Sequence, residues 1–252
     1  LESYRNPRKT LETNIFGTYN LIESTNNSSV NPKIVVATTD KVYKYPERFN
    51  DEKSELGGKD FYSISKVSKE LIVESVLQHP NFKELNISRV RSGNVVGGGE
   101  RRENRLFTDL ISSLINKNDF ILRNPNSIRP WQYILDSLTG YLMVAEKSYI
   151  NNANLVYNLN SEINNNYDVE AIAKLFLKHS GNRNKIILEN TEIYEEVDKL
   201  TINSYKANNE LGWSAKMGIE EIVKLIIDWE KNYTNESGPE YSFQEIKNYL
   251  SI

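Results

Sequence analysis

A short apolar segment that ends abruptly in polar residues constrains the fold of this chain most strongly. Residues 33–37 are largely apolar and β-branched, which is typical of a central strand buried on both faces. The polar residues that follow at once are Thr38, Thr39, Asp40 and Lys41. A helix is predicted over residues 62–78 and a second apolar strand over residues 85–90. This alternation of strand and helix predicts a parallel α/β sheet.

The remaining periodic segments are helices and one further strand. Apolar residues at helical spacing predict an amphipathic helix over residues 7–25. The other predicted helices cover residues 106–115, 169–179 and 219–233, and a strand near residues 155–159 could rejoin the sheet. Gly97, Gly98 and Gly99 mark a turn, and residues 123–131 read as a loop.

Composition excludes several functional classes. The net charge of −3 is made of interspersed signs and no apolar run reaches spanning length, so neither nucleic acid nor a membrane is an expected partner. The absence of cysteine excludes disulfides and thiolate metal sites, and two isolated histidines argue against a catalytic zinc. We therefore expect a cytoplasmic protein with no metal site.

Tyr62 and Lys66 are the first candidate catalytic residues. They are four positions apart, so on a helix they share one face and the ammonium can favour a phenolate. The reference pKa of tyrosine is about 10, and a nearby cation lowers it. A chance pairing is the alternative interpretation, because the chain contains 15 tyrosines and many lysines.

The polar residues at the end of the first strand complete a possible catalytic set. Thr39 could hydrogen-bond the hydroxyl that Tyr62 deprotonates, and Asp40 could protonate a departing hydroxyl. Lys41 could take a proton from carbon if burial and neighbouring cations lower its pKa. The alternative is a solvated turn between a strand and a loop.

Arginines and glycines bear on which ligand could bind. Five arginines lie within about forty residues of one another, and a guanidinium group can bind two oxygens of a phosphate at once. They are Arg89, Arg91, Arg105, Arg123 and Arg129. An exposed charged surface is the alternative. A glycine-rich dinucleotide fingerprint does not occur, so either no dinucleotide binds or we expect the fingerprint upstream of Leu1, which is not a start methionine.

Several blocks of sequence follow one another in a fixed order. They read ETNIFGT at 12–18, TDKVY at 39–43, LGGKDFYSISK at 56–66, RSGNVVGGGE at 91–100 and ILRNPNSIRPWQ at 121–132, with KA at 206–207 and LGW at 211–213. In this order they resemble the extended short-chain dehydrogenase/reductase superfamily and, within it, most closely the CDP-glucose 4,6-dehydratases. The resemblance covers nearly the whole chain.

The resemblance implies an NAD-dependent reaction on CDP-glucose. Hydride leaves C4 of the glucose ring, water is lost across C5 and C6, and hydride returns to C6 to give CDP-4-keto-6-deoxyglucose. Carried over by position, Tyr62 is the base at the C4 hydroxyl, and Lys66 tunes it while binding the nicotinamide ribose. Thr39 orients that hydroxyl and Asp40 is the acid at C6. Thr38, Tyr62 and Lys66 are the expected cofactor-binding residues.

The same carry-over assigns the remaining site residues. Lys41 stands where the dTDP-glucose relatives have a glutamate base, so it has to lose its own proton before it can act. The positions that match sugar and diphosphate contacts are Asn94, Arg105, Leu106 and Arg129, with Arg123 as a further candidate of the same kind.

The resemblance also implies an architecture. We expect a Rossmann-like parallel sheet that lacks its first strands, with a smaller C-terminal substrate domain. Residues 1–94, to which residues 131–160 return, are the expected remainder of the NAD-binding domain, and residues 95–130 and 161–252 the substrate-binding part. With its first strands upstream of Leu1, this polypeptide alone is expected to bind NAD poorly.

The analogy further implies a homodimer formed through the helices near Asn14 and over residues 62–78, and a role in deoxysugar supply for a surface polysaccharide. Alternatives remain open: another nucleotide-sugar 4,6-dehydratase, a 4-epimerase, or a truncated binding module that keeps the sugar-nucleotide pocket without turnover. Asp40 and Lys41 argue against an epimerase, which needs no acid or base at C5 and C6.

Overall fold

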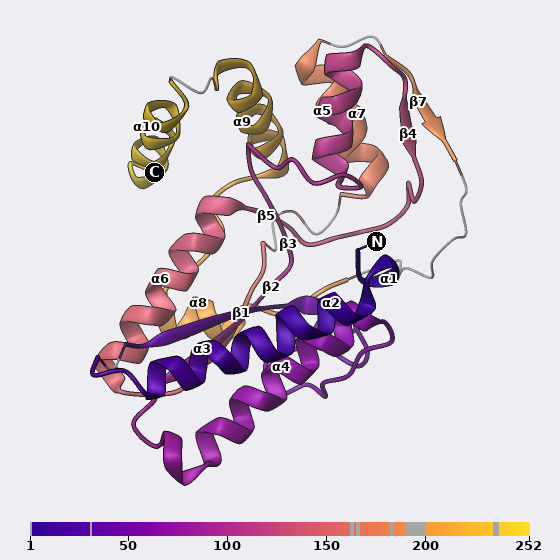
Figure 1. The fold of residues 1–252 in the computed structure, drawn as a ribbon. Helices are drawn as coiled ribbons and strands as arrows, with labels where there is room; N and C mark the ends of the chain where they lie inside the picture. The colour runs from indigo at the N-terminus through magenta and orange to yellow at the C-terminus, as the bar shows by residue number, and fades with distance from the viewer. Residues whose placement is uncertain are drawn as a thin grey trace. The chain divides into compact units, whose positions relative to one another are not determined.

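Every pair of strands that the structure describes is parallel. The computed structural model describes residues 2–30, 32–161, 164, 167–181, 184–189, 200–233 and 237–252 (Figure 1). Strands β1 (Ile34–Thr39), β2 (Ile87–Ser92) and β6 (Val156–Leu159) form one sheet in the order β1-β2-β6. Two smaller parallel pairs join β3 (Asn94–Val96) to β5 (Trp131–Tyr133) and β4 (Phe120–Leu122) to β7 (Ile186–Leu188). The predicted α/β fold with a parallel sheet is confirmed.

The chain divides into two compact units. The first unit contains Leu1–Gly93, Thr139–Asn160 and Leu200–Trp213, and the second contains Asn94–Leu138, Ser161–Lys199 and Ser214–Ile252.

These boundaries differ from the expected ones by more than one residue at two places. Residues 131–138 belong to the second unit, where β5 pairs with β3. Residues 200–213 belong to the first unit, where α8 (Tyr205–Leu211) contacts β6 and the Asn160 side chain donates to the Ile202 carbonyl at 2.7 Å. Which unit binds the cofactor stays a prediction.

Helices of the first unit pack on β1 and β2. The chain begins with α1 (Glu2–Arg5). The predicted helix over residues 7–25 follows and is confirmed as α2 (Pro7–Leu11), a π-helical turn (Glu12–Phe16) and α3 (Gly17–Asn26). The predicted helix over residues 62–78 is confirmed as α4 (Phe61–Gln78), which lies beside α3 in Figure 1. The buried residues that join these helices to the strands are Ile22, Ile34, Val36, Val73, Val76, Leu85 and Ile87.

Helix α6 (Ile134–Asn151) was not predicted as a helix, and Gly140 near its middle obscures it. A glycine inside a helix costs about 1 kcal/mol relative to alanine, so it weakens a helix prediction. The structure gives the reason for the glycine, because a Cβ at this position would lie 2.4 Å from Leu159 Cδ1. Close packing of α6 on β6 therefore outweighs the lower helix propensity.

The second unit has its own hydrophobic core. Its helices are α5 (Leu106–Asn116), α7 (Val169–Ser180), α9 (Ile219–Asn232) and α10 (Gly238–Leu250), of which the first three were predicted. Phe107, Leu110, Phe176 and Ile222 are among the buried residues between them. Gly98 follows β3 and packs so closely on Trp229 that a Cβ would lie 2.1 Å from the indole Cγ.

Among the described residues, no helix combines the length with the apolar character that crossing a bilayer requires.

Candidate active site

The end of β1 holds two of the predicted catalytic residues in direct contact. Thr39 is the last residue of the strand, and a short 3-10 helix, Asp40–Val42, follows. The Thr39 hydroxyl donates to Asp40 Oδ1 at 2.9 Å and accepts from the Lys41 amide at 3.4 Å. Thr39 and Asp40 are both buried. These contacts fix a hydroxyl and a carboxyl group side by side at the carboxyl end of a parallel strand, where ligands of α/β sheets bind.

Tyr62 is placed by the N-terminal cap of α4. The Asp60 carboxylate accepts from the amides of Tyr62 at 2.8 Å and Ser63 at 3.1 Å, and the Ser63 hydroxyl donates back to Asp60 at 2.8 Å. Gly58 leaves room for this arrangement, because a Cβ there would lie 2.6 Å from Ser63 Oγ. The cap fixes the first turn of the helix and therefore the backbone position of Tyr62.

Lys66 lies over the ring of Tyr62, as the spacing of four predicted. Its Nζ is 5.6 Å from the ring centroid. Burial, followed by the charge of Lys69, lowers the pKa of Lys66 from 10.5 to about 8. A tyrosine that acts as a general base needs a cation beside it, and Lys66 is placed to serve as one.

The structure brings these two segments together within the first unit. Val42, which follows Lys41, and Val67, which follows Lys66, belong to one buried cluster with Tyr43 and Ile202. The 3-10 turn also contacts α4 directly. The predicted catalytic residues therefore lie on two elements that pack on each other.

Thr38 is engaged differently from Thr39. Neighbouring residues of a strand point to opposite faces, and the Thr38 hydroxyl donates to the Glu70 carboxylate of α4 at 2.7 Å. Thr38 is buried. The Thr38 hydroxyl therefore donates its hydrogen bond within the protein, to Glu70. Its contact with the cofactor stays a prediction.

The predicted substrate-binding residues lie in the second unit and form two groups. The Asn94 amide donates to the carbonyl of Pro130, the neighbour of Arg129, at 3.0 Å. Arg129 is buried and donates to the Ile128 carbonyl at 2.9 Å.

In the other group, Arg123 donates to Asn104 at 2.9 Å. Asn104 precedes Arg105, the N-cap residue of α5, and Leu106 is the first residue of that helix. Arg105 is exposed. The structure thus brings Asn94 close to Arg129, and Arg123 close to the start of α5.

The prediction that five arginines bind a phosphate is wrong for Arg89 and Arg91, which pair with glutamates. Arg91 is 3% exposed, and its Nε and Nη2 donate to the two oxygens of Glu70 at 2.8 and 2.6 Å. Arg89 lies 3.8 Å from Glu70 and 3.7 Å from Glu74. Sequence reasoning missed Glu70, whose only local signal is that it stands four residues after Lys66.

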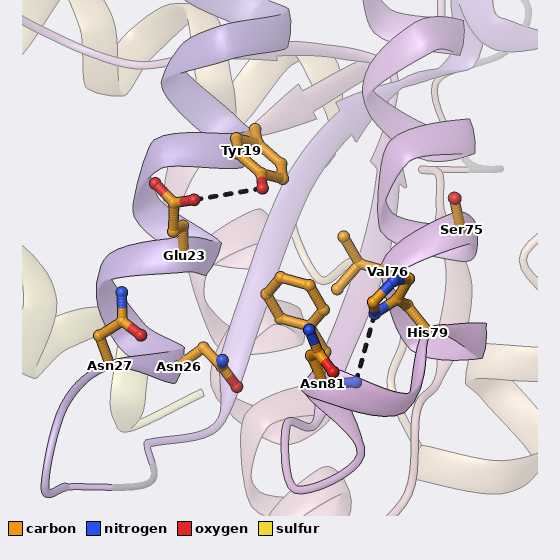
Figure 2. A pocket seen from close by; sticks show the side chains of 9 residues that line it. Tyr19, Glu23, Asn26, Asn27, Ser75, Val76, His79 and Asn81 are labelled. Atoms are coloured by element: carbon orange, nitrogen blue, oxygen red, sulfur yellow. Dashed lines mark hydrogen bonds between the residues drawn. The ribbon is translucent and has the colours of Figure 1, made fainter.

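A polar hollow lies at the other end of α4 (Figure 2). It has a volume of about 400 Å³, and Tyr19, Glu23, Ser75 and His79 are among the residues that line it. Ser75 follows Tyr62 by 13 residues, which on a helix corresponds to about 20 Å. This hollow is therefore not part of the candidate active site.

Among the described residues, no group of three or more histidine, aspartate or glutamate side chains is arranged to hold a metal ion.

Comparisons with known proteins show which family the chain belongs to. The sequence profile of the family described as GDP-mannose 4,6 dehydratase matches residues 1–226. CDP-glucose 4,6-dehydratase of Salmonella typhimurium is 32% identical over 260 residues, which cover 99% of this chain and 72% of that protein. UDP-glucose 4-epimerase of Pisum sativum is 26% identical over 257 residues, covering 92% and 70%.

The fold has close counterparts among solved structures. MoeE5 in complex with UDP-glucose and NAD superposes with a TM-score of 0.81 at 19% identity, covering 91% of this chain and 75% of that chain. The resemblance drawn from the sequence motifs is confirmed. The chain belongs to the GDP-mannose 4,6 dehydratase family.

Proposed function

We propose that this protein is an NAD-dependent nucleotide-sugar 4,6-dehydratase and that its substrate is CDP-glucose. The observation that carries the proposal is the packing of the Thr39, Asp40 and Lys41 turn against the helix that bears Tyr62 and Lys66. The 32% identity to a CDP-glucose 4,6-dehydratase supports this choice of nucleotide.

The residues present fit a nicotinamide cofactor. The phenol of Tyr62 and the ammonium of Lys66 lie at the start of α4, which packs on the turn after the carboxyl end of β1. Both groups can bind ribose hydroxyls, and ligands of parallel sheets bind at this edge. When bound, NAD supplies the acceptor for hydride from C4 and the donor of hydride to C6.

The protein's own groups handle the protons. Tyr62, helped by the Lys66 cation, takes the proton of the C4 hydroxyl, and the Thr39 hydroxyl orients that group. The ketone formed at C4 makes the C5 proton acidic, so a modest base suffices there. Lys41, in its neutral form, takes that proton, and Asp40 gives one to the C6 hydroxyl, which leaves as water.

A 4-epimerase is the second candidate, because family relatives include UDP-glucose 4-epimerase of Pisum sativum. An epimerase oxidises and reduces C4 but needs no acid or base for C5 and C6. The Asp40 carboxyl group, held at 2.9 Å by Thr39 and followed by Lys41, favours the dehydratase. A binding module without turnover is the third candidate.

Isotope transfer separates the three candidates. The full-length protein is incubated with NAD and CDP-glucose that carries deuterium at C4, with UDP-glucose and dTDP-glucose as parallel substrates. A dehydratase gives a 4-keto product lighter by one water, with the deuterium at C6. An epimerase returns the deuterium to C4 without loss of water, and a binding module returns unchanged sugar. Tyr62→Phe is the control that removes the base.

We further propose a homodimer and a cytoplasmic location. Phe61, Ile64 and Leu71 are exposed on α4 at spacings of three and seven residues, which places them on one helix face. A second copy of the same helix face would cover these apolar side chains. A protein without cysteine needs no oxidising compartment.

A further inference from the structure

The face of α4 that carries Tyr62 and Lys66 also carries Glu70, because helical residues four apart are neighbours. Glu70 is 0% exposed. Its Oε1 accepts from the Thr38 hydroxyl at 2.7 Å and from Arg91 Nε at 2.8 Å, and its Oε2 accepts from Arg91 Nη2 at 2.6 Å. Thr38 and Arg91 are opposite each other in the β1–β2 register. One carboxylate therefore ties the helix to both strands.

The remaining terminal nitrogen of Arg91 reaches the other half of the candidate active site. Nη1 donates to the Tyr43 hydroxyl at 3.0 Å and to the Glu52 carbonyl at 3.1 Å. Tyr43 follows the Asp40–Val42 turn directly, and its own hydroxyl donates to Asn158 of β6 at 2.6 Å. A single guanidinium thus contacts α4 and the segment that carries Asp40 and Lys41.

At neutral pH Glu70 is ionised and Tyr43 is protonated, and both states favour the hydrogen bonds described above. Although burial opposes ionisation of Glu70, the hydrogen bonds and charge of Arg91 bring its pKa below the usual value. Burial raises the pKa of Tyr43 to about 12, so its hydroxyl stays protonated and keeps its donated bond. Only arginine has three nitrogens that can serve these partners at once.

We propose that Arg91 and Glu70 are positioning residues that hold α4 and the Asp40–Tyr43 segment in the register that brings Tyr62 and Lys66 to the Thr39–Asp40 turn. The proposal rests on the proposed dehydratase function. Stability alone does not explain the pair, because a buried ion pair is often no better than well-packed apolar residues of similar volume. What apolar residues cannot replace is the directional contact with Thr38 and Tyr43.

Kinetics of two variants with matched controls test the proposal. Arg91→Lys keeps the charge but loses the fork, and Glu70→Gln keeps the shape but loses the charge. A displacement of catalytic groups by about 1 Å costs on the order of 100-fold in rate. We expect kcat to fall about 10- to 100-fold in both variants, with KM for the nucleotide sugar within about threefold.

The control variants are Arg89→Lys and Glu74→Gln. Arg89 is on the same strand, and Glu74 is one helical turn after Glu70 with a 53% exposed side chain. Their ion pairs, at 3.7 and 3.8 Å, are longer than those of Arg91. A lysine at position 89 keeps a positive charge beside Glu70, and the Glu74 carboxylate is exposed, so both controls should keep kcat within about twofold. Equal losses in the controls and the test variants overturn the proposal.

A double variant separates positioning from folding. Glu70→Leu combined with Arg91→Met replaces the pair with apolar side chains and is expected to fold. If positioning is the role, this variant has a normal unfolding temperature and a low kcat. A double variant with wild-type kcat overturns the proposal. If it does not fold, the Glu70→Gln variant, which is nearly isosteric, decides the question by the same comparison of kcat with KM.

A readout without turnover keeps this inference separate from the proposed function. The ammonium of Lys66 is titrated by NMR of protein with labelled lysine, assigned by Lys66→Arg. Loosening α4 exposes Lys66 to water and should raise its midpoint from near pH 8. If the wild-type protein makes no product, the proposed function fails, and an unchanged Lys66 midpoint in Arg91→Lys and Glu70→Gln then overturns the positioning role as well.

Discussion

Replacing Lys66 with methionine should stabilise the folded protein at neutral pH, although it removes a proposed catalytic group. Burial, and then the charge of Lys69, lower the pKa of Lys66 from 10.5 to about 8. At about 1.4 kcal/mol per unit, keeping this ammonium charged costs at most about 3 kcal/mol. Partial exposure screens part of that cost, and the lost contact with the Tyr62 ring is worth about 0.5–1 kcal/mol. The expected net gain is about 1–2 kcal/mol.

The pH dependence gives this prediction its sign. The unfolded chain keeps the Lys66 proton up to its ordinary pKa of 10.5, whereas the folded protein releases it near pH 8. The folded state therefore carries the whole penalty below pH 8 and recovers it as the pH rises to 10.5. Lys66→Met should raise Tm by roughly 3–6 °C at pH 7 and by much less at pH 10.

Circular dichroism melts of both proteins at the two pH values measure this difference. Lys83→Met, at an exposed position outside α4, is the control and should change Tm little at either pH. A variant that melts at or below the wild-type temperature at pH 7 would refute the reasoning that Lys66 is charged at a cost. A gain that is the same at both pH values would show that packing, and not charge, is responsible.

Three further predictions concern the elements around the site. Asp60→Ala removes the acceptor for the Tyr62 and Ser63 amides and should lower the free energy of unfolding by about 1–2 kcal/mol in urea titrations, with no change contradicting the capping role. Gly98→Ala places a Cβ against Trp229 and should cost about 1–3 kcal/mol, seen as earlier loss of tryptophan fluorescence; wild-type stability would contradict the close contact. Leu71→Glu should shift the mass from dimer to monomer in light scattering, and an unchanged mass would place the interface elsewhere.

Local periodicity explains which elements of the fold could be predicted. Helix α4 shows a helical period of apolar residues and strand β1 a continuous apolar run, and both were found to within a few residues. Strands β3 and β5 have three residues each, which is too short for a periodic pattern, and neither was predicted. Short strands are specified by their partners in space, and sequence alone does not contain that pairing.

The candidate site shows the same division between local and distant information. Tyr62 and Lys66 were found because their spacing on one helix is visible in the sequence. Arg91 was expected to bind phosphate because strand β2 was expected to end at residue 90, which left the arginine just beyond the strand. The strand extends to Ser92, and the buried charge of Arg91 is stabilised by Glu70, 21 residues earlier in the chain.

Glu70 also shows why the correct spacing can suggest the wrong partner. A glutamate four residues after a lysine on a helix favours an ion pair between them, which would keep the pKa of Lys66 high. Instead, the Glu70 oxygens accept from Arg91 and Thr38, and burial lowers the pKa of Lys66 to about 8. Because Glu70 is paired with Arg91, its negative charge does not offset the effect of burial on the pKa of Lys66. It follows that a change at Arg91 should alter both the position of α4 and the proton affinity of Lys66, because both depend on the same carboxylate.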